Sequence, residues 1–510
     1  MKGAKNTERG THMIKVNTNK VVRICENFWN HIHFHPTDAI EDEWGQRILN
    51  EVAKDGVAET VRMYNMLEDI VKQDENGNIY YDYTENDIRM DYIVKKGFNI
   101  LLINGYIPPF MAVNPDLTSS VSKNKKRYKG KMIITSQPKD YGLWEEVCYN
   151  YAKHITERYG NEVVSKWYIE CWNEPDINLF FLSNLPEDEA GTKARLVEYL
   201  KLYRGFVRGM TRANPNLQLG GPTLALKLDF LEGFLKTVKE ENLRLDFISV
   251  HTYGTGPIEL NNGTAPFNPK NTLIKQQAIN EVIVRFFPNT PVFVDEWGAS
   301  SHGFYNRDEC PALMFREGSE YAAYMGKMIC AYIESGVKVD KMMICLSGQH
   351  EMTVDFSGFR NLFTLNFIKK PIYNAFLLLS KLYKTDVEST GGDKNTVHLA
   401  TKEDGRVSVM LSYSSENFNE DLPKICETVK FEGISGKKTV SVWLIDESHT
   451  NPYKLCKRCG WGDEYDEKML AALREEGNLK PISVRTIDFD ECDEIKVEME
   501  NNALAIIEIV

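Results

Sequence analysis

The stretch Lys166-Trp-Tyr-Ile-Glu-Cys-Trp-Asn-Glu-Pro175 begins as a short apolar run and ends in Asn173, Glu174 and Pro175. A second stretch has the same form, because Pro291-Val-Phe-Val-Asp-Glu-Trp-Gly298 places Glu296 at the end of another apolar run. Short, nearly all-apolar runs are typical of parallel strands that are buried on both faces. In an eight-stranded βα barrel the reactive groups lie at the carboxyl ends of such strands. The two glutamates are therefore expected to meet at one end of a barrel.

The same rhythm extends over residues 25–385, where short apolar runs alternate with longer amphipathic stretches. Such alternation is typical of repeated βα units, so the sequence predicts an α/β fold with a (β/α)8 TIM barrel as catalytic domain. Eight strands are predicted at residues 28–34, 60–64, 99–104, 167–171, 218–221, 247–250, 292–294 and 342–346. Apolar spacings of three and four residues predict helices at 144–159, 189–213, 317–334 and 372–383.

The remaining residues have a different pattern of hydrophobicity. Residues 386–510 contain short segments of apolar and polar alternation, which predict an all-β, C-terminal β-sandwich domain. Residues 14–24 hold one or two strand-like segments that could join this sandwich. Residues 1–13 are polar and end in Gly-Thr-His-Met, which is typical of a tail left by cloning, so they are excluded from the fold prediction.

The charge and the hydrophobicity of the chain indicate which classes of binding partner it can have. The 510 residues carry a formal net charge of -12, with Lys and Arg scattered along the chain, which argues against binding nucleic acid. No apolar run approaches the roughly 20 residues that span a bilayer, which argues against a membrane protein. A neutral small molecule or a glycan is the expected partner, and association into a homo-oligomer stays open.

The cysteines are informative about the cellular compartment and about metal binding. The ten cysteines lie far apart, several of them in apolar segments, and no secretory signal is visible, so a cytoplasmic location is mildly favoured over an extracellular or periplasmic one. Cys456 and Cys459 provide half of the ligands of a zinc site, and no second Cys or His pair stands at a useful spacing. The sequence predicts no metal and no cofactor.

A glycosidase needs one carboxylic acid to protonate the leaving oxygen and one carboxylate on the other side of the anomeric carbon. Any single glutamate is more often a surface or structural carboxylate. Two of them at strand ends, each next to or near a tryptophan, favour the catalytic interpretation. We therefore predict Glu174 and Glu296 as the catalytic pair, with the Asn173 amide suited to bind the 2-hydroxyl of the sugar.

Trp-Asn-Glu-Pro with a later strand-end Glu-Trp resembles the clan A glycoside hydrolases. Within that clan, residues 138–176, Leu219-Gly-Gly-Pro222 and the segment from Leu245 to Tyr253 are similar to family 39, which contains β-xylosidases and α-L-iduronidases. The resemblance covers about residues 60–380. It implies a barrel with a β-sandwich, Glu174 as acid/base, Glu296 as nucleophile, Asn173 at the 2-hydroxyl, and His251 and Tyr253 beside the nucleophile. The alternative for His251 and Tyr253 is a hydrogen-bonded core pair.

Two departures from the family pattern concern the sugar. Arg62-Met-Tyr-Asn65 stands where the family usually has Arg-Phe-His-Gly, so Tyr64 replaces the expected histidine. Leu346-Ser-Gly-Gln-His-Glu351 replaces an aromatic-rich eighth strand with paired acids. Xylose specificity therefore does not follow from the resemblance.

Further residues are candidates for sugar contact. His33 and His35 alternate with His31, which invites a metal interpretation, but no set of carboxylates completes a site, and sugar-contacting or core histidines are favoured. Trp297 and Glu351 are candidate substrate contacts. Arg307 and Arg360 could bind the carboxylate of a uronate, although solvated surface arginines are the more common alternative.

The sequence thus predicts a retaining glycoside hydrolase that works by double displacement and is exo-acting on a non-reducing-end sugar of plant- or host-type oligosaccharides, β-xyloside-like or related. Two alternatives remain: a catalytically silent glycan-binding barrel, and a transglycosylase.

Overall fold

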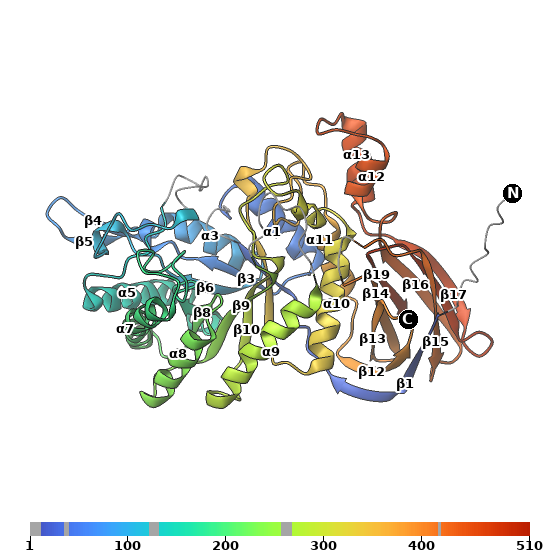
Figure 1. The fold of residues 1–510 in the computed structure, drawn as a ribbon, viewed down its shortest axis with the longest axis horizontal. Helices are drawn as coiled ribbons and strands as arrows, with labels where there is room; N and C mark the ends of the chain where they lie inside the picture. Colours follow the sequence, from blue (N-terminus) through green and yellow to red (C-terminus); the bar gives the residue numbers. More distant parts are fainter. Residues whose placement is uncertain (1–11, 35–39, 122–131, 257–267, 417–419) are drawn as a thin grey trace.

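A computed structural model describes residues 12–34, 40–121, 132–256, 268–416 and 420–510. It contains a closed barrel beside a second body made of strands (Figure 1). Neighbouring barrel strands run parallel. In pairing order they are β10 (Val292–Ser300), β11 (Lys341–Leu346), β2 (His31–Phe34), β3 (Thr60–Tyr64), β6 (Asn99–Asn104), β7 (Tyr168–Cys171), β8 (Gln218–Leu224) and β9 (Phe247–Thr255). The predicted (β/α)8 barrel is confirmed.

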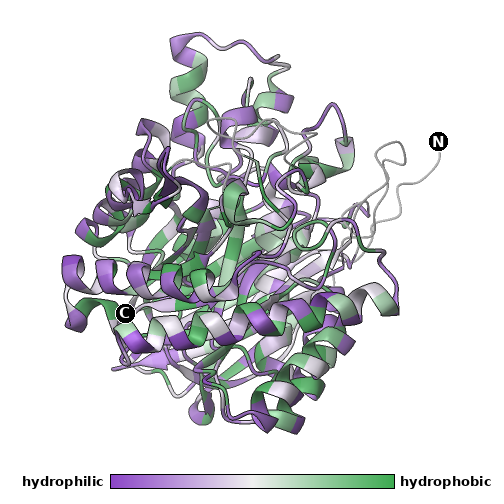
Figure 2. Ribbon diagram, turned by 90° about the vertical axis from the view of Figure 1, so that its left-hand side faces the viewer, coloured by the Kyte–Doolittle hydropathy of each residue, from purple (hydrophilic) through white to green (hydrophobic). Residues whose placement is uncertain are grey.

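Amphipathic helices surround the barrel, and Figure 2 shows hydrophobic strands in the interior with hydrophilic residues on the outer helices. The main ones are α1 (Glu43–Asp55), α3 (Thr84–Lys95), α5 (Tyr141–Tyr159), α7 (Glu189–Ala213), α8 (Leu228–Glu240), α9 (Pro269–Phe286), α10 (Ser319–Ser335) and α11 (Pro371–Leu379). None of the helices in the described ranges is long and apolar enough to cross a membrane.

Helices α5 and α7 show how sequence sets this layer. A Cβ on Gly209 of α7 would lie 2.3 Å from the carbonyl oxygen of Glu145 of α5, so only glycine permits the close approach. The indole of Trp144 then donates to the carbonyl of Leu202 across the contact, at 2.9 Å. These two helices cover the part of the barrel that carries Glu174.

Aromatic side chains fill the amino end of the barrel. Phe247 and Phe293 stack at 4.7 Å between ring centroids, and Tyr168 meets both rings edge-on. All three stand at the start of their strands. Because this end is packed with rings, polar side chains that point into the barrel are left to gather at its carboxyl end.

The second body is a nine-stranded sheet. Its order is β17 (Pro481–Asp488), β16 (Lys437–Ile445), β19 (Ala503–Ile509), β14 (Arg406–Tyr413), β13 (Thr396–Glu403), β12 (Thr385–Gly391), β1 (His12–Ile24), β15 (Ile425–Glu432) and β18 (Glu494–Met499). The N-terminal strand β1 pairs antiparallel with β12 and parallel with β15. It begins at His12, so the last two residues of the predicted tail belong to a strand.

The prediction of an all-β tail was wrong in one region. Residues 446–480 contain two helices, α12 (Pro452–Arg458) and α13 (Glu467–Glu476), which stand above the sheet in Figure 1. Each helix has an N-cap, because the side chain of Asn451 accepts from the Lys454 amide and that of Asp466 accepts from the Met469 amide. We call residues 446–480 the helical insertion.

Candidate active site

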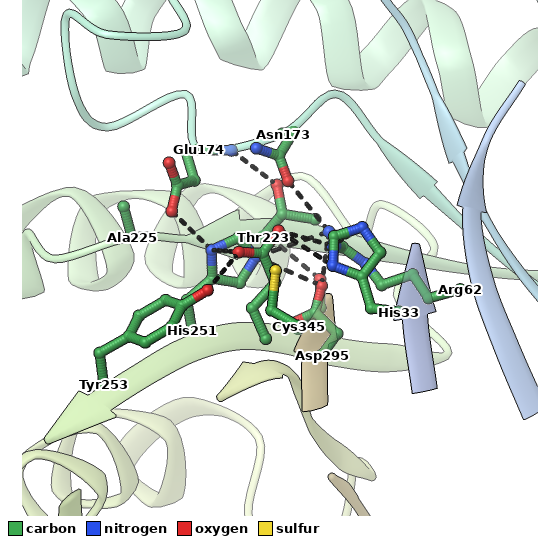
Figure 3. A network of polar contacts seen from close by, with 12 residues as sticks. His33, Arg62, Asn173, Glu174, Thr223, Ala225, His251, Tyr253, Asp295 and Cys345 are labelled. Carbon is green, nitrogen blue, oxygen red and sulfur yellow. Dashed lines mark hydrogen bonds and ion pairs between the residues drawn. The ribbon is translucent and has the colours of Figure 1, made fainter. Parts of the chain in front are cut away.

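Predicted site residues from four strands meet at the carboxyl end of the barrel. His33 lies on β2, Asn173 and Glu174 directly follow β7, His251 and Tyr253 lie on β9, and Glu296 lies on β10. Figure 3 shows the side chains of Glu174 and Tyr253 on one side of His251, with His33 on the other side of the cluster. The structure therefore brings together residues that lie as far apart in the chain as His33 and Glu296, which are separated by 263 positions.

The turn that carries Glu174 is locally strained. Trp172 and Glu174 have φ angles of 65° and 47°, in the left-handed region that disfavours residues with a Cβ. Such a conformation costs about 1–3 kcal/mol and persists only where the surroundings hold it. Here the Glu174 amide donates to the carbonyl of Thr223 at 3.1 Å. The Asp176 carboxylate also accepts from the backbone amides of residues 225–227, so the next loop fixes this turn.

The two glutamates lie close to one another. His251 Nδ1 is 2.7 Å from Glu174 Oε1 and 3.7 Å from Glu296 Oε2. One oxygen of each carboxylate lies within 4.8 Å of the other. Retaining glycosidases separate their two carboxyl groups by about 5–5.5 Å, whereas inverting enzymes need about 6.5–9.5 Å to admit a water molecule. The spacing here belongs to the retaining arrangement.

Glu296 is held as a carboxylate. Arg62 Nη1 donates to Oε1 at 2.8 Å, and the Tyr253 hydroxyl donates to Oε2 at 2.8 Å. Burial opposes ionisation of this group, but the positive charges of His251, His33 and Arg62 outweigh it and hold the pKa of Glu296 well below its usual value. An ionised carboxylate with few solvent contacts is suited to act as a nucleophile.

Glu174 has the opposite tendency. Burial raises its pKa, the hydrogen bond from His251 opposes that rise, and the negative charge of Glu296 adds to it. The net direction is upward, so Glu174 is the member of the pair that keeps a proton. Two neighbouring carboxyl groups whose pKa values are pushed apart are the pattern of an acid and a nucleophile.

Arg62 is the central residue that the sequence prediction did not place in the site. Its Nη2 lies 2.7 Å from Glu170 and 2.8 Å from Asp295, and also donates to Asn173 Oδ1 at 3.0 Å. One fully buried guanidinium therefore contacts and orders three acidic side chains, including Glu296. The signal was present in the sequence, because a charged residue inside the buried strand Thr60-Val-Arg-Met-Tyr64 needs a partner.

Replacing Arg62 with methionine is expected to lower the free energy of unfolding by about 3–5 kcal/mol, since the buried acidic side chains of Glu170 and Asp295 would lose their nearest positive charge. Chemical denaturation measures this change. Arg204→Met is the control, because Arg204 pairs with Glu241 at the surface and should cost at most about 1 kcal/mol. Equal losses in the two variants would contradict the central role of Arg62.

Arg360 and Arg307 have different surroundings. Arg360 is buried, donates from Nη1 to the Tyr253 hydroxyl at 2.7 Å and from Nε to Ser347 Oγ at 3.0 Å. Arg307 instead forms an ion pair with Asp463 of the helical insertion. Arg360 thus reaches Glu296 through the Tyr253 hydroxyl, whereas Arg307 joins the helical insertion to the carbonyl of Phe356 in the loop after β11.

The other predicted contacts differ in their burial and in their neighbours. The buried ring of Tyr64 lies 5.9 Å from the ring of His33, and Trp297 is fully buried with its ring against Tyr321. Glu351 is half-buried in the short helix η4 (Gln349–Glu351). His35 lies outside the described residues. The largest of these residues therefore shape the site from behind.

Among the residues that the structure describes, two groups of side chains bring donor atoms within 4.8 Å of one another, as a metal ion would require: His33 with Glu296 and Cys345, and Glu174 with His251 and Glu296. Arg62 Nη1 lies 3.2 Å from both ring nitrogens of His33 and 2.8 Å from Glu296. A buried guanidinium at that distance repels a cation, so neither group is a favourable metal site.

The cluster of predicted site residues is distinct from a surface hollow elsewhere on the barrel. The hollow lined by Arg47, Phe367 and Arg474 has a volume of about 340 Å³ and lies where α1 approaches α13. It contains none of the residues above. Chemistry and charge, rather than cavity size, identify the site.

Comparisons with known proteins find a matching family, similar sequences and similar folds. The model of the family described as glycosyl hydrolases family 39 matches residues 12–477. The chain is 25% identical over 493 residues to a beta-xylosidase of Caldicellulosiruptor saccharolyticus, covering 92% of each, and 26% identical over 311 residues to an alpha-L-iduronidase of Canis lupus familiaris, covering 56% of this chain and 41% of that protein. The fold resembles that of a monomeric beta-xylosidase from Caulobacter crescentus, with a TM-score of 0.82, 21% identity, and coverage of 98% of this chain and 99% of that one.

Proposed function

The chain belongs to glycosyl hydrolase family 39, and from that membership we propose that Glu296 is the nucleophile and Glu174 the acid/base of its reaction. The protein is a retaining glycoside hydrolase that acts on a carbohydrate substrate at a non-reducing-end sugar. One observation carries the assignment of roles: the two carboxyl groups approach within 4.8 Å while their pKa values move in opposite directions.

In the first step, Glu296 attacks the anomeric carbon while Glu174 gives its proton to the departing glycosidic oxygen. The bond from carbon to that oxygen breaks as the ester bond to Glu296 forms. Asn173 is suited to the sugar 2-hydroxyl, since Arg62 binds its Oδ1 and leaves the amide hydrogens as donors.

In the second step, Glu174 removes a proton from water, which attacks the same carbon and releases Glu296. Esterification removes the negative charge of Glu296, and the pKa of Glu174 falls as a consequence. The same residue can therefore act first as an acid and then as a base. Two inversions leave the sugar with its original configuration.

We propose a neutral, β-xyloside-like sugar as the substrate. Both arginines that could have bound a uronate carboxylate already have partners, because Arg360 is bonded to Tyr253 and Ser347, and Arg307 to Asp463. The relatives named beta-xylosidase are also matched over more of the chain than those named alpha-L-iduronidase.

Hydrolysis of five aryl glycosides compared side by side tests this proposal: β-D-xyloside, β-D-glucoside, β-D-galactoside, α-L-arabinoside and α-L-iduronide. We expect the highest kcat/KM on the β-D-xyloside. The iduronide should be a poor substrate, since the two candidate arginines, Arg307 and Arg360, are already bonded to other groups. A preference for the iduronide would refute the proposal, and binding of oligosaccharides without hydrolysis would favour a silent glycan-binding barrel.

We further propose that residues 25–385 form the catalytic domain and residues 386–510 an accessory domain, with β1 added to the accessory sheet. A reducing compartment is proposed as the place of action, supported by ten cysteines that are all free thiols. Association into a homo-oligomer stays a prediction.

A further inference from the structure

We propose that the helical insertion, residues 446–480, positions the catalytic nucleophile by holding the loop that carries Arg360. This inference rests on the proposed role of Glu296. The loop in question, residues 347–370, connects β11 to α11 and passes beneath the insertion.

Apolar contacts join the insertion to this loop. Phe356 and Ile368 of the loop form one buried cluster with Cys456 and Leu473 of the insertion. The rings of Phe356 and Tyr453 lie 5.6 Å apart. Phe356 has a φ angle of 49°, a conformation that costs about 1–3 kcal/mol for a residue with a Cβ and that needs support from its surroundings. The insertion supplies part of that support.

Polar contacts reinforce the junction. Arg307 pairs with Asp463 of the insertion and donates from Nη1 to the carbonyl of Phe356 at 3.3 Å. The Arg307 amide donates to the carbonyl of Ser357 at 2.8 Å. Arg474 of α13 donates to the carbonyl of Asn366 at 2.9 Å. The loop is therefore held by the insertion at both of its halves.

The fixed part of the loop leads directly to Arg360. The Gly358 amide donates to Glu317 Oε1 at 2.7 Å, and the carbonyl of Arg360 accepts from the Ser347 amide at 2.9 Å. The guanidinium has little room to move, since a Cβ on Gly303 would lie 2.2 Å from Nη2. Displacement of residues 356–358 would therefore displace Arg360.

Arg360 acts on Glu296 through Tyr253. It donates to the Tyr253 hydroxyl at 2.7 Å, and that hydroxyl donates to Glu296 Oε2 at 2.8 Å. The positive charge of Arg360 also helps to hold the pKa of Glu296 low. The other titratable or charged groups around Glu296 come from β2, β3, β9, β11 and the β7 turn, with Asp295 next to it on β10: His33, Arg62, Tyr64, Glu174, His251, Asp295 and Cys345.

Tyr453→Ala tests the inference, because Tyr453 contacts Phe356 and has no contact with Arg360, Tyr253 or Glu296 in the part of the chain that the structure describes. Withdrawal of Arg360 would raise the pKa of Glu296, which must be ionised to react. The acid limb of the kcat/KM profile should therefore move to higher pH, and kcat/KM near neutrality should fall about tenfold, since small misplacements of reacting groups can cost up to about 100-fold.

Three variants complete the experiment, all assayed with the aryl glycoside that the wild-type enzyme hydrolyses fastest. Asp463→Arg sets two like charges against each other at the surface and should move the acid limb in the same direction. Tyr453→Phe keeps the ring and should restore the wild-type profile. Phe489→Ala removes an aromatic ring from the sheet core, where Phe489 meets Phe431, and should leave the limb in place.

An unmoved acid limb in both Tyr453→Ala and Asp463→Arg would overturn the inference, whatever happens to the amount of active enzyme. A limb that moves equally in Phe489→Ala would overturn it as well, because the effect would then be general destabilisation. Glu296→Ala distinguishes failure of this inference from failure of the proposed function. If Glu296→Ala stays active, the assignment of Glu296 as nucleophile is wrong, whatever the insertion variants show.

Discussion

Replacing Glu296 with alanine is expected to lower kcat by about 10⁵-fold, equivalent to about 7 kcal/mol of transition-state stabilisation. The reason is that the variant has no group to form the covalent ester, and the second carboxylate is held as an acid. Steady-state hydrolysis of an aryl glycoside measures the loss. Asp308→Ala, a change at an exposed carboxylate in the loop after β10, should keep the wild-type rate.

Azide gives this prediction a second readout. A small anion can enter the space left by the Glu296 carboxylate and attack the anomeric carbon from that side, while Glu174 still protonates the leaving oxygen. Activity should partly return, with the glycosyl azide of inverted configuration as product. Recovery of hydrolysis with no inverted azide would show that Glu296 is not the nucleophile.

Glu174→Ala should lower kcat/KM by about 10²–10⁴-fold for substrates with poor leaving groups, the range that general acid catalysis contributes. Substrates with a good leaving group such as 2,4-dinitrophenol need no proton, so their first step should be much less affected. Their second step should slow, because no base then activates water. Azide should speed that step and give the azide of retained configuration, in contrast to Glu296→Ala.

The pH profile of Glu174→Ala sharpens the assignment. In the wild-type enzyme Glu174 must be protonated for the first step, and its pKa is raised, so kcat/KM should fall as the pH rises through that pKa. Without Glu174 this basic limb should disappear. The acid limb set by Glu296 should remain. A variant that keeps the wild-type basic limb would assign the acid to another residue.

The barrel strands were predictable in place but not always in length. β9 and β10 continue five and six residues beyond their predicted ends at Val250 and Val294. The extra residues include His251, Tyr253 and Glu296, polar side chains that interrupt the apolar run because they form the site. The hydrophobic pattern therefore ends at the first polar site residue, although the backbone pairing of β9 with β10 continues beyond it.

The helical insertion and β17 could not be predicted for a different reason. The helices α12 and α13 are short, and α13 buries only Leu473. Strand β17 is mostly exposed at the edge of the sheet, so it lacks the alternation that marks a half-buried strand. Their place depends on contacts with distant segments such as Phe356 and Arg307, which no local pattern records.

The site residues also differ in whether a local pattern or only a long-range contact marks them. Glu174, Glu296 and Asn173 could be proposed from the sequence because a strand end is a local feature with a known chemical meaning. Arg62 and Arg360 act through partners more than 100 residues away, and Arg307 faces Asp463 across the domain junction. The sequence indicates that such a charge needs a partner, but only the fold identifies which one.

The most direct measurement for the central claim is covalent trapping of the nucleophile. The fluorine at carbon 2 of a 2-deoxy-2-fluoro glycosyl fluoride of the preferred sugar slows both steps. Because the anomeric fluoride leaves readily, the first step is slowed less than the second, so the glycosyl ester should accumulate. Proteolysis and mass spectrometry of the trapped enzyme should find one sugar on the peptide that contains Glu296. A sugar on Glu174, or on any carboxylate other than Glu296, would contradict the account.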